Sequence, residues 1–266
     1  MSTDDAEVTR RLRAAGCVFA EEEAALLLES AERDGVDPEG LIVRRIHGEP
    51  LEHIVGWAEF HGLRVAVGPG VFVPRRRTGF LVDLALDHLR TSQVTRPVVL
   101  DLCCGSGALG LALGVAAADA GVSIELSASD IEPAAVVLAR RNLTALGATV
   151  HEGDLFEPVP AKLRARIDIL LCNTPYVPTD RIAHMPPEAR DHEPRRALDG
   201  GPDGLDILRR VAAEAGNWLA PGGALLVEES RSQAAAAADI LRTNGLRARI
   251  TESEDYDATA VLGIRV

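Results

Sequence analysis

The chain has 266 residues, of which 47% are apolar and only 3% aromatic, and its formal net charge is −12. This length suits one large domain, or a main domain with a small one, whose core is built from Ala, Leu, Val and Ile. An acidic chain repels nucleic-acid phosphates at long range, so a nucleic-acid partner is not expected.

The first residues, the longest apolar run and the cysteine spacing give expectations about the protein's location and about metal binding. Its first residues include Asp4 and Asp5 rather than the basic start and apolar stretch of a secretory signal. The longest uncharged apolar run, 108–118, is too short to span a bilayer. The cysteines have no C-x-x-C spacing, and the adjacent Cys103 and Cys104 are poorly placed to chelate a metal or to bridge. We therefore expect reduced cysteines, no metal site, no membrane association and a cytoplasmic protein.

The N-terminal part of the chain has a helical pattern. Residues 4–47 form three short amphipathic stretches that are bounded by Gly or Asp-Pro, which are helix-end signals. From residue 57 the sequence WAEFHGLRVAVGPGVFVPR alternates apolar and polar residues around glycines, which predicts a hairpin. We expect a helical domain over residues 1–52 and a β-hairpin linker over residues 53–74.

Residues 75–266 predict a third unit. A helical run at 78–90 is followed, from Pro97 to the C-terminus, by alternating strands and helices. One of these helices is expected to end at the Pro-Gly-Gly of residues 221–223. Such alternation predicts an α/β fold with a doubly wound, mostly parallel sheet.

A glycine-rich turn follows the first strand of this unit. In LDLCCGSGALG a buried strand ends near an acid, and the turn after it opens a helix. Glycines allow a ligand to approach the backbone closely, although a tight strand-to-helix turn alone would also need them. The candidate cofactor-binding residues here are Asp101, Cys103, Cys104, Gly105, Ser106 and Gly107.

A second acid lies at the end of the next strand. Asp130, followed by Ile131, comes about 20 residues after the glycine turn, where a carboxylate can accept hydrogen bonds from ribose hydroxyls. The alternative is that Asp130 caps the helix near Pro133. The loop lacks G-x-G-x-x-G and has Asp101 at its front, which suits an ammonium group better than a pyrophosphate. S-adenosylmethionine is therefore favoured over NAD.

Two later segments complete the predicted pocket. In EGDLFEP, Asp154 can accept from an adenine amino group while Leu155 and Phe156 wall the ring, or Phe156 simply belongs to the core. The run ILLCNTPY is a strand that ends in a turn, and the strand is expected to lie beside LDLCC.

This turn supplies the candidate catalytic residues. The Asn173 side-chain oxygen and the Thr174 carbonyl can accept from a planar NH2 group. Pro175 keeps Thr174 extended, and Tyr176 offers a flat ring face.

Taken together, these segments resemble the HemK/PrmC-type protein-(glutamine-N5) methyltransferases. GEPLEHIVGWAEFHGLRVAVGPGVFVPR is similar to the linker of that family, NTPYVPT stands at its Asn-Pro-Pro-Tyr motif, and EPRRALDGGPDGLDILRRV and LAPGGALLVEES follow in the same order. The resemblance implies a class I S-adenosylmethionine-dependent methyltransferase with a seven-stranded sheet. It also implies an N-terminal domain that engages its substrate, the GGQ motif of a peptide chain release factor or another glutamine-containing protein.

The chain departs from the family pattern at three places. Thr174 replaces the first proline, Cys103 replaces the first glycine of the loop, and PRRRTGF makes an acidic segment basic at residues 75–77. The three arginines predict either a solvated face or a basic patch for an acidic partner. Two other functions stay open: methylation of a nucleic-acid amino group, and cofactor binding without catalysis.

Overall fold

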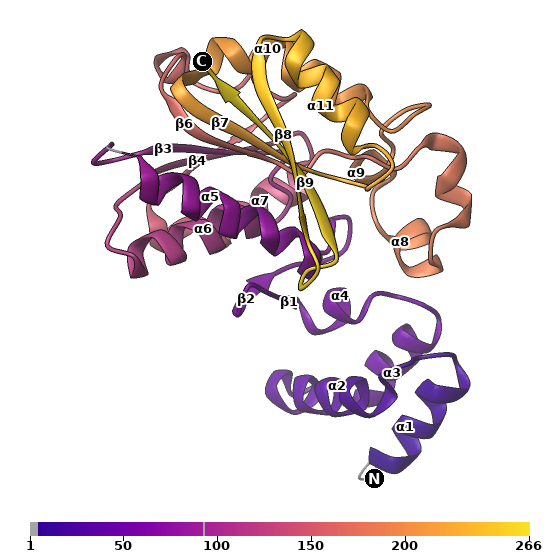
Figure 1. The fold of residues 1–266 in the computed structure, drawn as a ribbon. Coiled ribbons are helices and arrows are strands. Elements are labelled where there is room, and N and C mark those ends of the chain that lie inside the picture. The colour runs from indigo at the N-terminus through magenta and orange to yellow at the C-terminus, as the bar shows by residue number, and fades with distance from the viewer. Residues whose placement is uncertain (1–4, 93) are drawn as a thin grey trace.

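The computed structural model describes residues 5–92 and 94–266, which form a helical N-terminal unit, a small hairpin and a large α/β unit (Figure 1). The helices of the N-terminal unit are α1 (Asp5–Ala14), α2 (Ala20–Asp34), α3 (Pro38–Ile46) and α4 (Leu51–Val55). Their apolar stripes, including Leu12, Leu27 and Ile42, pack into one separate core. Helix α4 was not predicted, and the predicted limit between residues 52 and 53 falls inside it.

The hairpin is confirmed. Strands β1 (Trp57–Phe60) and β2 (Leu63–Ala66) pair antiparallel across His61 and Gly62. Both turn residues have positive φ, 53° and 75°, as the two-residue turns that match strand twist require. The chain then runs through the 3₁₀ turn η1 (Arg76–Thr78) into the large unit.

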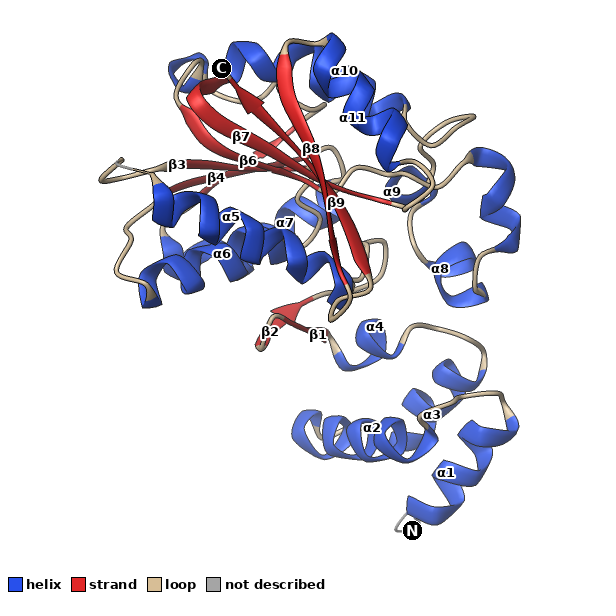
Figure 2. Cartoon of the chain, viewed as in Figure 1, coloured by secondary structure: helices blue, strands red, loops and turns tan. Residues whose placement is uncertain are grey.

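The large unit is built on one seven-stranded sheet in the order β5-β4-β3-β6-β7-β9-β8, in which only β9 runs antiparallel to its neighbours. The predicted doubly wound, mostly parallel sheet is thus confirmed (Figure 2). Its strands are β3 (Val98–Leu102), β4 (Glu125–Asp130), β5 (Thr149–Glu152), β6 (Ile167–Cys172), β7 (Leu219–Glu229), β8 (Leu246–Ser253) and β9 (Ala258–Arg265).

Helices cover both faces of the sheet. One face carries α5 (Gly79–Thr91), α6 (Ala108–Asp119) and α7 (Pro133–Leu143), and the other carries α10 (Asp206–Trp218) and α11 (Ala234–Thr243). Side chains alternate along a strand, so Val99 of β3 enters the first core while Leu100 enters the second. Short 3₁₀ turns, η2 (Thr144–Leu146) and η3 (Ala161–Leu163), precede β5 and β6.

One expectation was wrong in detail. The helix expected to end at residues 221–223 ends earlier, at Trp218, and the Pro-Gly-Gly lies within β7, where the pairing with β6 shifts between Ile167 and Ile169. The segment between β6 and α10, for which no elements were predicted, also has structure of its own. It contains η4 (Thr179–His184), α8 (Pro187–His192) and α9 (Arg195–Leu198).

Two further observations concern the predicted location. None of the helices in residues 5–92 and 94–266 is both long and apolar enough to cross a membrane. All four cysteines are free thiols.

Candidate active site

A cavity of about 430 Å³ opens at the carboxyl ends of β3, β4, β5 and β6. Strands β3 and β6 are adjacent, and the chain continues outward from them in opposite directions, which is where open α/β sheets bind ligands. The cavity brings together most of the predicted residues: Cys103, Cys104, Gly105, Ser106, Asp130, Ile131, Asp154, Leu155, Asn173, Thr174, Pro175 and Tyr176.

Asp101 and Gly107 do not line this cavity. Asp101 is fully buried and points to the sheet face under α6, where its Oδ2 accepts a hydrogen bond from the amide of Gly110 at 2.8 Å. Burial raises the pKa of Asp101 to about 8. Gly107 has a φ of 77°, and a Cβ there would press on Leu143 of α7. Strand alternation and helix packing therefore direct both residues away from the cavity.

Asp130 ties the glycine turn to the start of α7. Its Oδ2 accepts from the amide of Gly105 at 2.7 Å, and its Oδ1 accepts from the amide of Glu132 at 2.9 Å. Glu132, not Asp130, occupies the N-cap position. Burial raises the pKa of Asp130. Asp130 therefore binds a main-chain amide at the start of α7, as the capping alternative expected, although it is not the N-cap residue itself. It also lines the cavity.

The turn after β5 divides its residues between cavity and core. Leu155 lines the cavity in a left-handed conformation with a φ of 46°. Asp154 also lines it, but Arg210 of α10 already binds its carboxylate at 2.7 Å. Phe156 stacks on Trp218 with ring centroids 5.3 Å apart and belongs to the core. Of the two readings of Phe156, the core reading is therefore correct.

Asn173 and Thr174 line the cavity, and each carries an acceptor without a partner. The Asn173 Oδ1 is buried, and no donor among residues 5–92 and 94–266 reaches it. Within the same described ranges, no hydrogen bond ends on the Thr174 carbonyl. Buried acceptors without partners are costly in a folded protein, so an unpaired amide oxygen on a residue that lines a cavity indicates a place for a hydrogen-bond donor.

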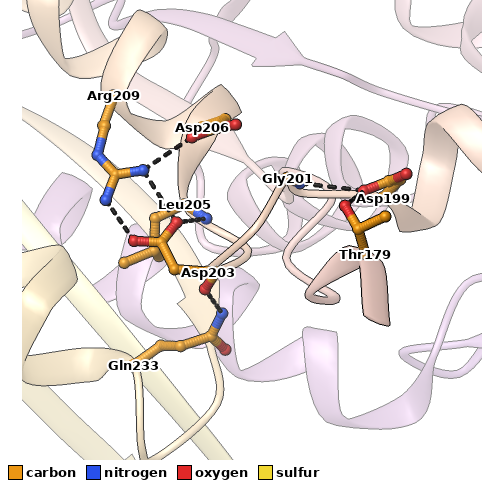
Figure 3. Close-up of polar contacts among 8 residues, drawn as sticks. All are labelled: Thr179, Asp199, Gly201, Asp203, Leu205, Asp206, Arg209 and Gln233. Carbon is orange, nitrogen blue, oxygen red and sulfur yellow. Dashed lines mark hydrogen bonds and ion pairs between the residues drawn. The ribbon is translucent and has the colours of Figure 1, made fainter. Parts of the chain in front are cut away.

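The backbone beyond these acceptors is held by the loop before α10. Gln233 donates from its Nε2 to the carbonyl of Tyr176 at 2.9 Å and to that of Asp203 at 3.0 Å. Asp203 binds the amide of Leu205 and the guanidinium of Arg209 (Figure 3). These bonds make the loop a rigid support for the turn that carries Tyr176.

A neighbouring contact in the same loop ties the turn from its other side. Asp199 accepts from the Thr179 hydroxyl at 2.6 Å and from the amide of Gly201 at 3.1 Å (Figure 3). Because the Thr179 amide also donates to the Gly201 carbonyl at 2.9 Å, the segment after Tyr176 has little freedom to move.

The arginines of residues 75–77 match the reading of a solvated face only in part. Arg75 binds the buried carboxylate of Glu193 at 2.7 Å, and Arg77 binds the buried carboxylate of Glu228 at 2.8 Å. Arg76 and Arg77 are exposed, while Arg75 is half-buried, and Arg75 and Arg77 also line the cavity. Only contacts between distant segments reveal these partners, so the sequence held no signal for them.

Other lining residues were also missed. They come from the hairpin linker and from the segment between β6 and α10, and include Phe60, Phe72, Met185, Arg196 and Leu198. Arg196 of α9 forms an ion pair at 3.2 Å with Glu132 at the start of α7, so the two cavity-lining residues join these helices at the cavity. The only signal in the sequence that could have drawn attention to Phe60 and Phe72 is that the chain has few aromatic residues.

Comparison with known proteins agrees with this arrangement. Residues 62–185 match the model of the methyltransferase small domain. The release factor glutamine methyltransferase of Streptomyces coelicolor is 40% identical over 73% of this chain and 67% of its own length. That of Deinococcus radiodurans is 38% identical over 92% of this chain and 91% of its own length.

This chain belongs to the release factor glutamine methyltransferase family. It is therefore an S-adenosylmethionine-dependent N-methyltransferase, as predicted. A T. thermophilus 16S rRNA methyltransferase, solved in complex with AdoMet and guanosine, shares the fold with a TM-score of 0.56 at 19% identity, over 79% of this chain and 50% of its own.

The cavity of this family member fits its cofactor. The volume lies within the range of about 300–1,000 Å³ usual for small-molecule sites, and Leu109, Leu155 and Ile207 give it apolar walls. The Asp130 carboxylate stands where a ribose is expected, beside the backbone of Gly105. Cys103, which replaces a family glycine, keeps a positive φ of 56°, so the loop retains the backbone shape that glycine favours.

Proposed function

We propose that this protein transfers a methyl group from S-adenosylmethionine to the side-chain amide nitrogen, N5, of a glutamine in the GGQ motif of a peptide chain release factor. The observation that carries the proposal is the unpaired, buried Oδ1 of Asn173, a residue that lines the cavity together with Thr174, whose main-chain carbonyl is also unused. Two acceptors side by side match the two hydrogens of a primary amide. Membership of the family supports the same substrate.

The mechanism depends on positioning. When bound, S-adenosylmethionine would supply an electrophilic methyl group on a sulfonium; the S–CH3 bond breaks as the N–CH3 bond forms, the neutral thioether leaves, and the methylated nitrogen releases one hydrogen to water as a proton. Asn173 Oδ1 and the Thr174 carbonyl accept the two amide hydrogens, so the nitrogen lone pair is directed into the cavity. Orientation of this kind contributes up to about 7–11 kcal/mol in favourable cases. The same two dipoles stabilise the positive charge that develops on the nitrogen during transfer.

The remaining predicted residues hold the cofactor. Asp130, with Ile131 beside it, binds the ribose. The backbone of residues 103–106 lies along the methionine part. Leu155 packs on the adenine, and Asp154 accepts from the adenine amino group while keeping its contact with Arg210. Asp101 supports the loop from beneath α6 rather than touching the ligand.

The helical unit and the hairpin complete the proposal. Residues 1–52 recognise the release factor and residues 53–74 join them to the methyltransferase domain of residues 75–266. An ion pair supports this coupling: the buried Arg45 of α3 binds Glu23 of α2 and also Glu188 of α8 at 2.6 Å. The segment between β6 and α10, which lines part of the cavity, is thus anchored on the unit proposed to bind the substrate.

Transfer of tritium from labelled S-adenosylmethionine tests the substrate. We expect label in purified release factor and none in a release factor whose GGQ glutamine is replaced by alanine. Ribosomal RNA and transfer RNA serve as the nucleic-acid alternatives. Label in RNA, or in release factor regardless of the GGQ glutamine, would contradict the proposal.

Two variants test the site. Asn173→Ala removes one acceptor and should lower turnover by about 100-fold or more, a loss comparable to that of one transition-state hydrogen bond, while cofactor affinity stays within a few-fold. Asp130→Ala should instead raise the cofactor dissociation constant. Asn217→Ala, at an exposed position of α10, is the matched control. Full activity in Asn173→Ala would show that the amide is held elsewhere.

A further inference from the structure

The hydroxyl of Tyr176 lies in a closed triangle of polar contacts. Arg77 donates from Nη2 to the Tyr176 oxygen at 2.6 Å, and the Tyr176 hydroxyl donates to Oε1 of Glu228 at 3.0 Å. Arg77 also donates from Nε to that same Glu228 oxygen at 2.8 Å. The far end of the tyrosine is therefore bound by both of its partners, which are themselves bound to each other.

Three distant segments supply this triangle. Tyr176 follows β6, Arg77 lies in η1 directly before α5, and Glu228 is near the end of β7. Glu228 pairs with Ala260 of β9 on one side, and its neighbour Val227 pairs with Cys172 of β6 on the other. The sheet thus fixes the Glu228 backbone on both sides, and the carboxylate is a rigid point of attachment.

The charges of the triangle are balanced only while Arg77 is present. The Glu228 side chain is 4% exposed and its Oε2 finds no donor in the described part of the chain. Arg77 forms the only ion pair that Glu228 has among residues 5–92 and 94–266. A buried carboxylate without a cation is strongly unfavourable, so Arg77 keeps Glu228 in place as the acceptor of the Tyr176 hydroxyl.

We propose that Arg77 is a positioning residue for the methyl transfer and acts by fixing the ring of Tyr176 beside Asn173. The inference rests on the proposed function, because it gives the ring face the task of packing on the substrate amide. A phenol that donates one hydrogen bond and accepts another has its oxygen pinned and its ring plane defined. Burial and the Glu228 charge raise the pKa of Tyr176 to about 12, so the hydroxyl remains a donor at neutral pH.

A double-mutant cycle tests this role. Arg77→Lys keeps the charge that Glu228 needs but cannot donate to both partners from one planar group, and Tyr176→Phe keeps the ring and removes the hydroxyl. We expect each single change to lower kcat for release factor by about 5- to 10-fold, and the double variant to lose no more than Tyr176→Phe alone. The dissociation constant of S-adenosylmethionine should change less than twofold in all three.

The control is Arg76→Gln, an exposed arginine of the same turn that does not line the cavity and should leave kcat unchanged. If the Arg77→Lys loss multiplies with the Tyr176→Phe loss, to about 25-fold or more, Arg77 acts independently of the hydroxyl and the inference is overturned. The same holds if Arg77→Lys is as active as the native protein.

A second measurement does not need the reaction. The chain has two tyrosines, Tyr176 and Tyr256, so ring-¹³C-labelled tyrosine gives two sets of NMR signals, assigned with Tyr176→Phe. We expect slow ring rotation, seen as separate or broadened signals, for Tyr176 in the native protein and in Arg76→Gln, and sharp averaged signals in Arg77→Lys. If no methyl is transferred to release factor, the proposed function fails, and this spectrum alone decides whether Arg77 holds the ring. An unchanged Tyr176 signal in Arg77→Lys would refute it.

Discussion

Glu229, at the end of β7, is predicted to make the stability of this protein fall as pH rises. Its side chain is 3% exposed, and neither carboxylate oxygen has a partner among the described residues. Burial, together with the nearby charges of Glu228 and Asp203, raises the pKa of Glu229 to about 8. The group therefore remains protonated in the folded protein at a pH where the unfolded chain has lost its proton.

The sign and size of the effect follow from this difference. Between the ordinary glutamate pKa of about 4.3 and the folded value of about 8, the folded state binds more protons, so the free energy of unfolding decreases with rising pH. At 1.36 kcal/mol per pKa unit the loss reaches about 4 kcal/mol at pH 7 and about 5 kcal/mol well above pH 8. Glu229→Gln, which has the same shape and no titration, should remove this loss.

Urea unfolding followed by circular dichroism between pH 5 and pH 8.5 measures the effect. We expect Glu229→Gln to exceed the native protein by only about 1 kcal/mol at pH 5 and by about 4–5 kcal/mol at pH 8. Glu254→Gln, in an exposed turn, should track the native protein at every pH. A Glu229→Gln difference that is the same at pH 5 and pH 8 would refute the reasoning, because the carboxyl would then not be buried in its neutral form.

Two further changes probe the turn after β6. Thr174→Val removes a buried hydroxyl that has no partner among the described residues but keeps the main-chain carbonyl. We expect an activity assay to show that kcat is retained, and urea unfolding to show that the free energy of unfolding rises by about 1 kcal/mol. Lost activity there would mean that the hydroxyl, not the carbonyl, is used. Gly204→Ala places a Cβ against the Tyr176 carbonyl and the Gln233 amide at a φ of 80°. The substitution should therefore lower the free energy of unfolding by about 1–3 kcal/mol and should also lower kcat. An unaffected kcat would show that this loop does not support the turn.

Local patterns were enough to predict the sheet and the place of the site. The mainly apolar runs VVLDL and IDILLC identified two buried strands, and the parallel order placed their ends side by side. Since each strand is followed by a turn with glycine or with Asn-Thr-Pro, the cavity had to form at that edge. The approximate location of Asn173 could therefore be predicted without any knowledge of loops.

The direction of individual side chains could not be predicted with the same certainty. Asp101 is one residue before the end of β3, and the alternation of the strand turns it under α6 rather than into the cavity. Asp154 lines the cavity wall, yet its ion pair with Arg210 joins the turn after β5 to α10. Such a pair depends on how helices pack across the sheet, which no local pattern records.

The basic run at residues 75–77 shows why composition alone misleads at such a site. Arg75 and Arg77 look like surplus charge in sequence, but each neutralises a glutamate that the fold buries from a distant segment, Glu193 after α8 and Glu228 in β7. Burying either acid without its arginine would be strongly unfavourable, so the arginines are needed for the fold to close around the cavity. An acidic chain can thus place a basic segment at its active site in order to neutralise acids that the fold buries there.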